Sequence, residues 1–283
     1  MLSRRTFSLS LAAACLARAA SAAPLGIEPG IQLYSVGDAM RADTPGTLKA
    51  LRAIGYRKVQ TAGLGRYSAR EFRRLLDDAG LRCAACHFGF AGGDNDALFE
   101  STAILGASFT GSGGLFGALG IDAATADAGA YHRMAKLANA IGGQAKRAGV
   151  TFTLHNHNME FRSLGRATGF DLLLKETDPA LVGLEMDCGW VRVAGADPVR
   201  YLKNHPGRFP LLHIKDFQKA PQPRTAPGGP PGRPLGQGFI DYRPIFAAAQ
   251  GVKHYFVEQE PPYRDFTALE AAKISYQYLQ SLG

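Results

Sequence analysis

The chain has little of what would place it in several other classes of protein. It has 283 residues and a net charge of +8, but no run of five or more basic residues. Three of its positive charges, Arg4, Arg5 and Arg18, lie in the first 22 residues, and the remainder carries 29 Lys and Arg against 24 Asp and Glu. This mild excess does not favour a nucleic-acid partner.

A dinucleotide-binding pattern and a disulfide framework are also missing. No Gly-x-Gly-x-x-Gly sequence follows the first predicted strand, which disfavours the dinucleotide-binding form of a doubly wound open sheet. The chain has four cysteines, and an odd number remains without Cys15, so no full disulfide framework is implied. Cys83 and Cys86 have redox-motif spacing, but in a strand-like run residues three apart face opposite sides. We therefore expect them to be buried small residues.

The first 22 residues have the three parts of an export signal. Arg4 and Arg5 precede an apolar stretch at 9–17 and then Ala20-Ser21-Ala22, which has the small-x-small form of a signal-peptidase site. The adjacent arginines followed by Phe7 resemble a twin-arginine signal. The apolar stretch is shorter than the roughly 20 residues that cross a bilayer, so no stable membrane insertion is expected. We predict a cleavable twin-arginine-type signal at 1–22 and a periplasmic or secreted protein; a short amphipathic N-terminal helix is the alternative.

The rest of the chain, 23–283, alternates between strand-like and helix-like segments. Short apolar runs predict strands at 30–36, 56–61, 81–87, 107–110, 150–155, 181–187, 209–215 and 253–258. Helical spacing with start and stop signals predicts helices at 44–54, 68–79, 95–105, 123–148, 169–176, 197–204, 241–250 and 267–282. Eight such pairs have the count and size of a single-domain α/β protein, a (β/α)8 TIM barrel. Residues 218–238 are rich in Pro and Gly and predict an ordered loop or a mobile lid.

Four of the predicted strands end in polar residues two positions apart. These pairs are His155 and His157, Glu185 and Asp187, His213 and Lys215, and Glu258 and Glu260. The carboxyl ends of parallel barrel strands converge on one rim, so the four pairs are expected to meet there. Carboxylates and imidazoles together suit a divalent metal cation, Mn, Mg, Co or Zn. The sequence therefore predicts a metal site at this rim and leaves the metal open.

Five motifs together resemble the sugar phosphate isomerase/epimerase family, whose members have a xylose isomerase-like TIM barrel. They are Gly30-Ile-Gln-Leu-Tyr-Ser35, Leu154-His-Asn-His-Asn-Met-Glu-Phe161, Glu185-Met-Asp-Cys-Gly-Trp190, Leu212-His-Ile-Lys-Asp216 and Phe256-Val-Glu-Gln-Glu260. In that family two Glu, one Asp and one His hold a divalent metal. The resemblance implies Glu160, Asp187, His213 and Glu258 as the ligands. Many relatives have glutamate where this chain has His155, so the first ligand is either His155 or Glu160, and Glu160 is favoured.

The resemblance also implies a substrate site around the metal. The residues expected there are Gln32, Tyr34, His87, His155, His157, Trp190 and Lys215. Lys215 would hold a carbonyl or developing enolate oxygen. Trp190 would stack on a sugar ring, although it could equally pack in the core.

The implied reaction is proton transfer at a carbon next to a carbonyl of a ketose or keto-sugar, with Glu160 and Glu258 as the catalytic pair. The same enolate could instead expel a β-substituent, which would give a lyase or dehydratase acting on 3-keto-glycosides or inososes. A non-catalytic sugar-binding barrel is another alternative, because fold alone does not fix function. An endonuclease IV-type repair enzyme is disfavoured, since it would need three zinc ions and more ligands. A homo-oligomer remains open.

Overall fold

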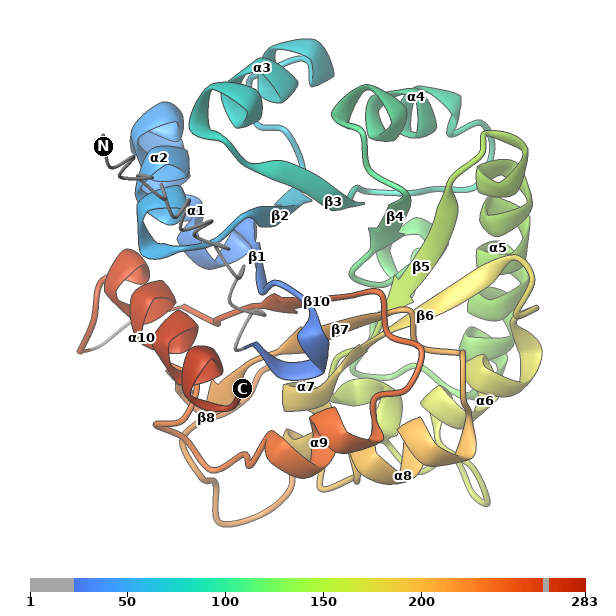
Figure 1. Cartoon of the computed structure of the whole chain (residues 1–283). Helices are drawn as coiled ribbons and strands as arrows, with labels where there is room; N and C mark the ends of the chain where they lie inside the picture. Colours follow the sequence, from blue (N-terminus) through green and yellow to red (C-terminus); the bar gives the residue numbers. More distant parts are fainter. Residues whose placement is uncertain (1–22, 262–264) are drawn as a thin grey trace, which may run out of the picture.

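The computed structural model describes residues 23–261 and 265–283. The predicted signal peptide at 1–22 lies outside the described residues. In the described part of the chain, eight parallel strands close into a barrel in the order β1-β10-β7-β6-β5-β4-β3-β2. Figure 1 shows these strands at the centre with helices around them. The prediction of a single-domain α/β TIM barrel is confirmed.

The barrel strands are short, and six of the eight end at or next to predicted site residues, β2 and β4 being the exceptions. Their bounds are β1 Gly30–Gln32, β2 Lys58–Ala62, β3 Arg82–His87, β4 Phe109–Ser112, β5 Thr151–His155, β6 Val182–Asp187, β7 Leu211–Ile214 and β10 His254–Val257. Two further short strands, β8 Asp216–Phe217 and β9 Gly232–Arg233, pair antiparallel outside the barrel. This pair gives the Pro- and Gly-rich segment 218–238 an ordered base.

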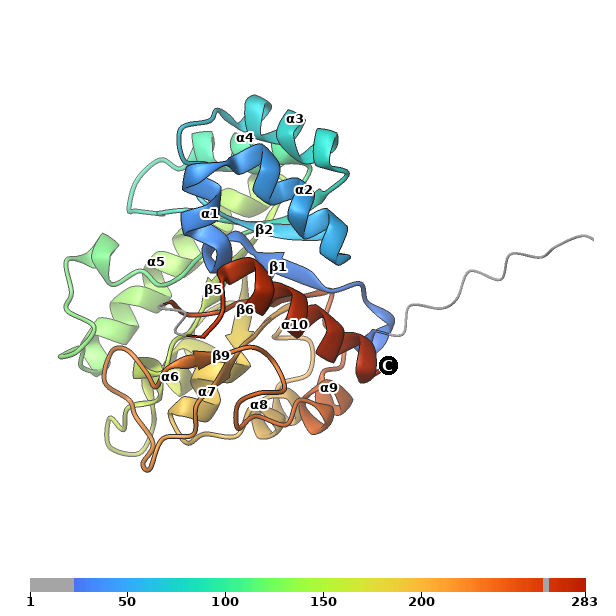
Figure 2. The same cartoon turned by 90° about the vertical axis from the view of Figure 1, so that its left-hand side faces the viewer.

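The helices pack around the barrel, and most of them begin at a residue whose side chain caps the helix. They are α1 Gly37–Ala42, α2 Thr44–Ile54, α3 Ala69–Ala79, α4 Asp96–Leu105, α5 Ala128–Arg147, α6 Gly169–Glu176, α7 Cys188–Val193, α8 Pro198–Asn204, α9 Arg243–Ala248 and α10 Ala268–Ser281. Ser68, Thr168 and Thr267 form capping boxes for α3, α6 and α10, satisfying backbone N–H groups at each start. The last helix, α10, lies close to α2 near the start of the chain (Figure 2). None of the helices in the described part is long and apolar enough to cross a membrane.

The first predicted strand, 30–36, is shorter than expected. It ends at Gln32 and continues as a 3₁₀ helix, η2, at Leu33–Val36. The side-chain oxygen of Gln32 accepts a hydrogen bond from the Tyr34 backbone N–H at 3.1 Å, which closes this turn. An apolar run of this length does not distinguish a strand from a strand followed by a helical turn. Tyr34 consequently leaves the barrel wall and is exposed.

The expected opposite orientation of Cys83 and Cys86 is wrong, although both side chains are buried as predicted. The pairing of β2 with β3 shifts by one residue, from Val59 opposite Cys83 to Gln60 opposite Ala85. This irregularity breaks the period of two, as a β-bulge does. Both cysteines therefore belong to the large core between strands and helices, while Ala84 and Ala85 face the barrel interior. The two sulfur atoms lie 3.6 Å apart and are not bonded.

Candidate metal centre and active site

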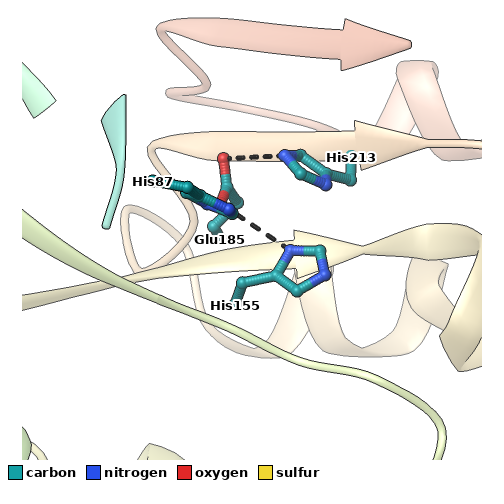
Figure 3. A group of neighbouring side chains, drawn as sticks. All are labelled: His87, His155, Glu185 and His213. Carbon is teal, nitrogen blue, oxygen red and sulfur yellow. Dashed lines mark hydrogen bonds and ion pairs between the residues drawn. The ribbon is translucent and has the colours of Figure 1, made fainter. Parts of the chain in front are cut away.

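The carboxylate of Glu185, at the end of β6, is surrounded by polar side chains from four other strands. Its Oε2 lies 2.5 Å from His87 Nε2, and its Oε1 accepts a 2.7 Å hydrogen bond from Gln60 Nε2. His213 Nε2 is 3.2 Å from Oε1, and His155 Nδ1 is 3.7 Å from Oε2. Figure 3 shows the three imidazoles grouped around this carboxylate. Burial opposes ionisation of Glu185, but His213 and His87 hold its pKa well below the usual range.

His213, from β7, lies between two carboxylates. Its Nε2 faces Glu185, while its Nδ1 lies 2.6 Å from Oε2 of Glu258, which follows β10. Burial disfavours a charged imidazole, but the two carboxylates raise the pKa of His213 to about 10. Lys215 and His213 lower the pKa of Glu258 well below its usual range, against the effect of burial. Without a bound cation, His213 is thus an imidazolium between two carboxylates.

Lys215 makes a buried ion-pair cluster next to this histidine. Its Nζ lies 2.8 Å from Asp187 Oδ2, 2.8 Å from Glu258 Oε2 and 2.7 Å from Glu260 Oε1. Burial opposes its charge, but the three carboxylates raise the pKa of Lys215 well above its usual value. Gly189 makes room for this side chain, because a Cβ at position 189 would lie 2.3 Å from Lys215 Cγ.

Asp187 is held in place by the structure that follows β6. Its Oδ1 accepts a 2.8 Å hydrogen bond from the Trp190 backbone N–H and so caps the short helix α7. The Asn156 side chain hydrogen-bonds both the backbone N–H and the carbonyl oxygen of Asp187. Burial, together with Glu258, raises the pKa of Asp187 to about 6, although Lys215 opposes the shift. These contacts fix one carboxylate oxygen and leave the other facing Lys215.

Glu160 belongs to neither group of side chains that could hold a metal ion, although it is close enough to Asp187 for the two carboxylates to interact. It lies in the 3₁₀ helix η4, Met159–Phe161, where its Oε2 accepts a 2.9 Å hydrogen bond from the His157 backbone N–H. Burial raises the pKa of Glu160 to about 7. His155, the alternative first ligand, lies 3.6 Å from Asp187 and its ring centre is 4.4 Å from that of His213. The geometry therefore brings His155, and not Glu160, together with Asp187, His213 and Glu258.

Two overlapping groups of side chains can hold a metal ion in residues 23–261 and 265–283. One consists of His87, His155, Glu185 and His213, and the other of His155, Asp187, His213 and Glu258; within each group, one ligand atom per residue lies within 4.8 Å of the others. Nδ1 of His155 is buried and makes no hydrogen bond; its contact with Glu185 Oε2 is an ion-pair contact at 3.7 Å. This atom and the mixed carboxylate and imidazole donors fit a divalent cation. In the second group, the Lys215 ammonium contacts Asp187 and Glu258, the two carboxylates that a metal ion would bind.

A cavity of about 720 Å³ opens above these side chains and is called the first cavity here. Six of the seven predicted substrate-binding residues line it, together with Glu258, Glu260, Ala62, Gly113, Pro261 and segment 228–232; the six are Gln32, Tyr34, His87, His155, His157 and Trp190. The seventh, Lys215, lies outside the lining and is only 1% exposed. Burial lowers the pKa of His157 to about 4, so this imidazole is neutral at pH 7. The first cavity thus offers neutral and anionic acceptors to a polar ligand.

Segment 218–238 contributes one side of the first cavity and is anchored near its middle and at its C-terminal end. The amide nitrogen of Asn158 lies 2.8–2.9 Å from the backbone oxygens of Arg224, Ala226 and Gly228. Asp216 accepts hydrogen bonds from the backbone N–H groups of residues 236, 238 and 240. Gly229 packs on Trp190, where a Cβ would lie 2.5 Å from the indole ring. The segment is therefore an ordered wall of the cavity.

Three residues of the site were not among the predicted ligands or substrate contacts. Glu185 has the same strand parity as Asp187, and Glu260 the same parity as Glu258, so both could have been included from the pattern alone. Gln60 lies in an ordinary apolar run and carried no such signal. Its Nε2 bonds Glu185, and its Oε1 lies 2.5 Å from His213 Nε2.

Comparison with known proteins agrees with this architecture. Residues 48–282 match the family described as xylose isomerase-like TIM barrel. The chain belongs to this family. The match covers most of the described barrel, including every candidate metal ligand.

Individual relatives of this xylose isomerase-like barrel include enzymes that act on sugars. An inosose dehydratase from Geobacillus thermodenitrificans (strain NG80-2) is 30% identical over 138 residues, which cover 44% of this chain and 45% of that protein. The chain thus spans less than half the length of this relative. A solved sugar phosphate isomerase/epimerase from Parabacteroides distasonis ATCC 8503 is 25% identical with a TM-score of 0.75, covering 90% of this chain and 94% of that one. IOLI protein with a binding zinc atom shares the fold, with 13% identity, a TM-score of 0.67, and coverage of 90% and 98%.

Proposed function

We propose that this protein is a metal-dependent sugar isomerase or epimerase that abstracts a proton next to the carbonyl of a ketose or keto-sugar. The observation that carries the proposal is the group His155, Asp187, His213 and Glu258, whose ligand atoms lie close together and two of whose members, His155 and Glu258, line the first cavity. A divalent cation bound there would polarise a carbonyl oxygen and make the neighbouring C–H more acidic. The zinc atom bound by IOLI protein, which has the same fold, supports the choice of a metal.

Glu258 is the residue best placed to move the proton. It lines the first cavity, and Lys215 and His213 keep it ionised, so its carboxylate can accept a proton from a substrate carbon. Neutral His157 lines the same cavity, and its buried Nδ1 has no hydrogen-bond partner among the described residues. We propose that His157 accepts a hydrogen bond from a substrate hydroxyl and orients the sugar.

Glu160 is proposed as the second proton carrier. With its pKa at about 7, it exists in both protonation states near neutral pH, which suits a group that both gives and takes a proton. To reach the substrate it would first have to release the His157 backbone N–H. Lys215 acts through Glu258 and Asp187, and we assign it a positioning role.

A dehydratase reaction is the second candidate, supported by the similarity to inosose dehydratases. It begins with the same proton transfer to Glu258. The bond from the β-carbon to its oxygen substituent then breaks, and that substituent takes up a proton and leaves as water or an alcohol. The product is an unsaturated ketone, so the two reactions are distinguished by their products.

The proposal is tested by metal analysis and by hydrogen exchange. We expect the purified protein to contain about one divalent ion per chain, and to incorporate deuterium from D₂O at the α-carbon of ketoses, 3-keto-sugars or inososes. The Glu258→Gln variant should lose exchange by roughly 10²–10⁴-fold, the usual contribution of a general base. A wild-type protein that binds a metal and a keto-sugar without any exchange would instead be a sugar-binding barrel.

We also infer that the chain is exported, based on the twin-arginine-like sequence before residue 23. N-terminal sequencing of the mature protein should begin near Ala23, and the protein should appear in the periplasmic or secreted fraction. Changing both Arg4→Lys and Arg5→Lys should retain it in the cytoplasm. Normal export of this double variant would contradict a twin-arginine route.

A further inference from the structure

A second cavity, of about 530 Å³, lies beside the first and shares two of its lining residues, Tyr34 and Ala62. This second cavity is formed by η2, α1, the start of α2 and α3, and the loop after β2, which contribute the apolar side chains of Leu33, Met40, Leu64, Tyr67 and Phe72. Its volume is in the range of pockets that bind small organic molecules. The polar first cavity therefore adjoins a more apolar one at these two residues.

Tyr34 stands at the junction of the two cavities. Among the described residues, it and Leu25 are the large hydrophobic side chains that are exposed, and 47% of Tyr34 is accessible. Single exposed apolar residues are common on protein surfaces. A ring that lines two adjoining cavities, however, can contact a ligand that extends through both. Ala62, which has a small side chain, also lines both cavities.

The charged groups of the second cavity are basic. Arg41 and Arg66 line it, and no acidic side chain among the described residues does. Arg41 pairs with Asp38, which lies outside the cavity lining. Arg66 donates a 3.1 Å hydrogen bond to the Tyr67 hydroxyl and lies 5.3 Å from the centre of its ring, but makes no ion pair within residues 23–261 and 265–283. The second cavity thus favours neutral or anionic groups over cations.

We propose that the second cavity is an aglycone subsite, and that the substrate is a keto-glycoside whose sugar ring lies in the first cavity while an aromatic aglycone lies in the second. This inference rests on the proposed function, since it names the substrate class of the same site. Tyr34, Tyr67 and Phe72 provide aromatic contacts for a flat ring. Arg66 is available for a phenolate or carboxylate on that ring. A free monosaccharide or a methyl glycoside would leave this volume empty.

The test compares binding of a phenyl and a methyl 3-oxo-glucoside to the metal-loaded protein by titration calorimetry. We expect the phenyl compound to bind about tenfold more tightly, and Met40→Trp, which fills only the second cavity, to remove this difference without changing methyl-compound affinity. Arg66→Glu, at an exposed position, should weaken binding of a carboxyphenyl 3-oxo-glucoside more than that of the phenyl compound. Arg74→Glu, which makes the same charge change on α3 outside the second cavity, is the matched control and should change neither.

The outcomes separate the subsite from the enzymatic proposal. Equal affinities for phenyl and methyl compounds in the wild-type protein, or an unchanged preference in a folded Met40→Trp variant, would overturn the aglycone subsite even if deuterium exchange occurs. A phenyl preference that Met40→Trp removes, together with carboxyphenyl binding that Arg66→Glu weakens, without any exchange, would support the subsite and contradict the proposed reaction. If Met40→Trp does not fold, Arg66→Glu with the carboxyphenyl compound decides.

Discussion

The interior of the barrel is filled differently at its two ends. Toward the amino ends of the strands, Ala84, Ala85, Leu211 and Phe256 form an apolar cluster with Phe109 packed against it. Toward the carboxyl ends, the same strands continue into histidines and carboxylates, so that Leu211 is followed two residues later by His213 and Phe256 by Glu258. The apolar cluster packs beneath the polar residues. The buried charges at the carboxyl ends are paired with one another, and leaving any one of them unpaired would be unfavourable.

Lys215→Met should give the largest effect, because it removes a cation from the polar end. Asp187, Glu258 and Glu260 would then lose their shared partner, and breaking a buried ion pair in this way costs about 3–5 kcal/mol. We expect this loss in the free energy of unfolding of metal-free protein, measured by urea denaturation.

Saturating divalent metal should recover part of that stability in Lys215→Met, since a cation can replace the lysine between Asp187 and Glu258. Glu258→Gln is the matched comparison, because it removes one of the anions that a metal would need. Equal stability of Lys215→Met and wild type without metal would show that the ion pairs of Lys215 do not stabilise the metal-free protein.

Leu211→Ala tests whether the apolar end supports the site. Leu211 is fully buried in the interior cluster, so its truncation should lower the free energy of unfolding by about 2–5 kcal/mol. Because His213 follows on the same strand face, we also expect weaker metal binding, measured by competition with a chelator. Leu212→Ala is the matched control, since Leu212 is equally buried but packs in the outer core between strands and helices. Equal metal affinity in the two variants would show that the two ends act independently.

Much of the fold, and the meeting of polar residues at the carboxyl ends of the strands, could be predicted from the sequence. The eight strands and their helices follow from apolar runs and caps, and helix 44–54 has the predicted bounds. The convergence of the strand ends follows from barrel geometry. Local departures from regular periods could not be predicted. The bulge at Ala84 turns both cysteines outward, and the turn after Gln32 moves Tyr34 to the junction of the two cavities.

The assignment of the first ligand depends on contacts that spacing does not encode. Glu160 was favoured because it lies in a motif, whereas the structure brings His155 to the other candidate ligands. A hydrogen bond from the backbone of the intervening turn holds the Glu160 carboxylate in place. Similarly, Gln60 becomes part of the site only because β2 lies within reach of Glu185 across the barrel.

Asn158→Ala should loosen segment 218–238 at the barrel rim without disturbing the rest of the site. The Asn158 amide is the side-chain anchor for residues 224–228, so its loss should cost about 1–2 kcal/mol, the value of one or two hydrogen bonds. We expect faster proteolysis and faster amide exchange in segment 218–238, with metal content unchanged. Asn139→Ala is the control, because it removes side-chain hydrogen bonds to the backbone of Glu176 and Asp178, at the C-terminal end of α6 and outside segment 218–238. If amide exchange in segment 218–238 is unaltered, Asn158 is not its anchor.

Lys58→Met should change the free energy of unfolding less than the preceding variants do, and should raise it at pH 7. Lys58 lies at the amino-terminal end of the barrel, away from the metal site. Lys58 is 6% exposed, its Nζ lies 3.3 Å from His254 Nδ1, and burial lowers its pKa to about 8, although Glu28 partly opposes the shift and Arg82 adds to it. Below pH 8 the folded protein carries this charge at a cost. Between pH 8 and about 10.5 the lysine is protonated in the unfolded chain but largely neutral in the folded protein. The unfolded state therefore binds more protons, and the free energy of unfolding rises with pH over this range. With solvent screening of Lys58 taken into account, Lys58→Met should gain about 1 kcal/mol at pH 7 and lose this advantage toward pH 10. A variant less stable than wild type at pH 7, with the same pH slope, would show that the lysine stabilises the barrel floor.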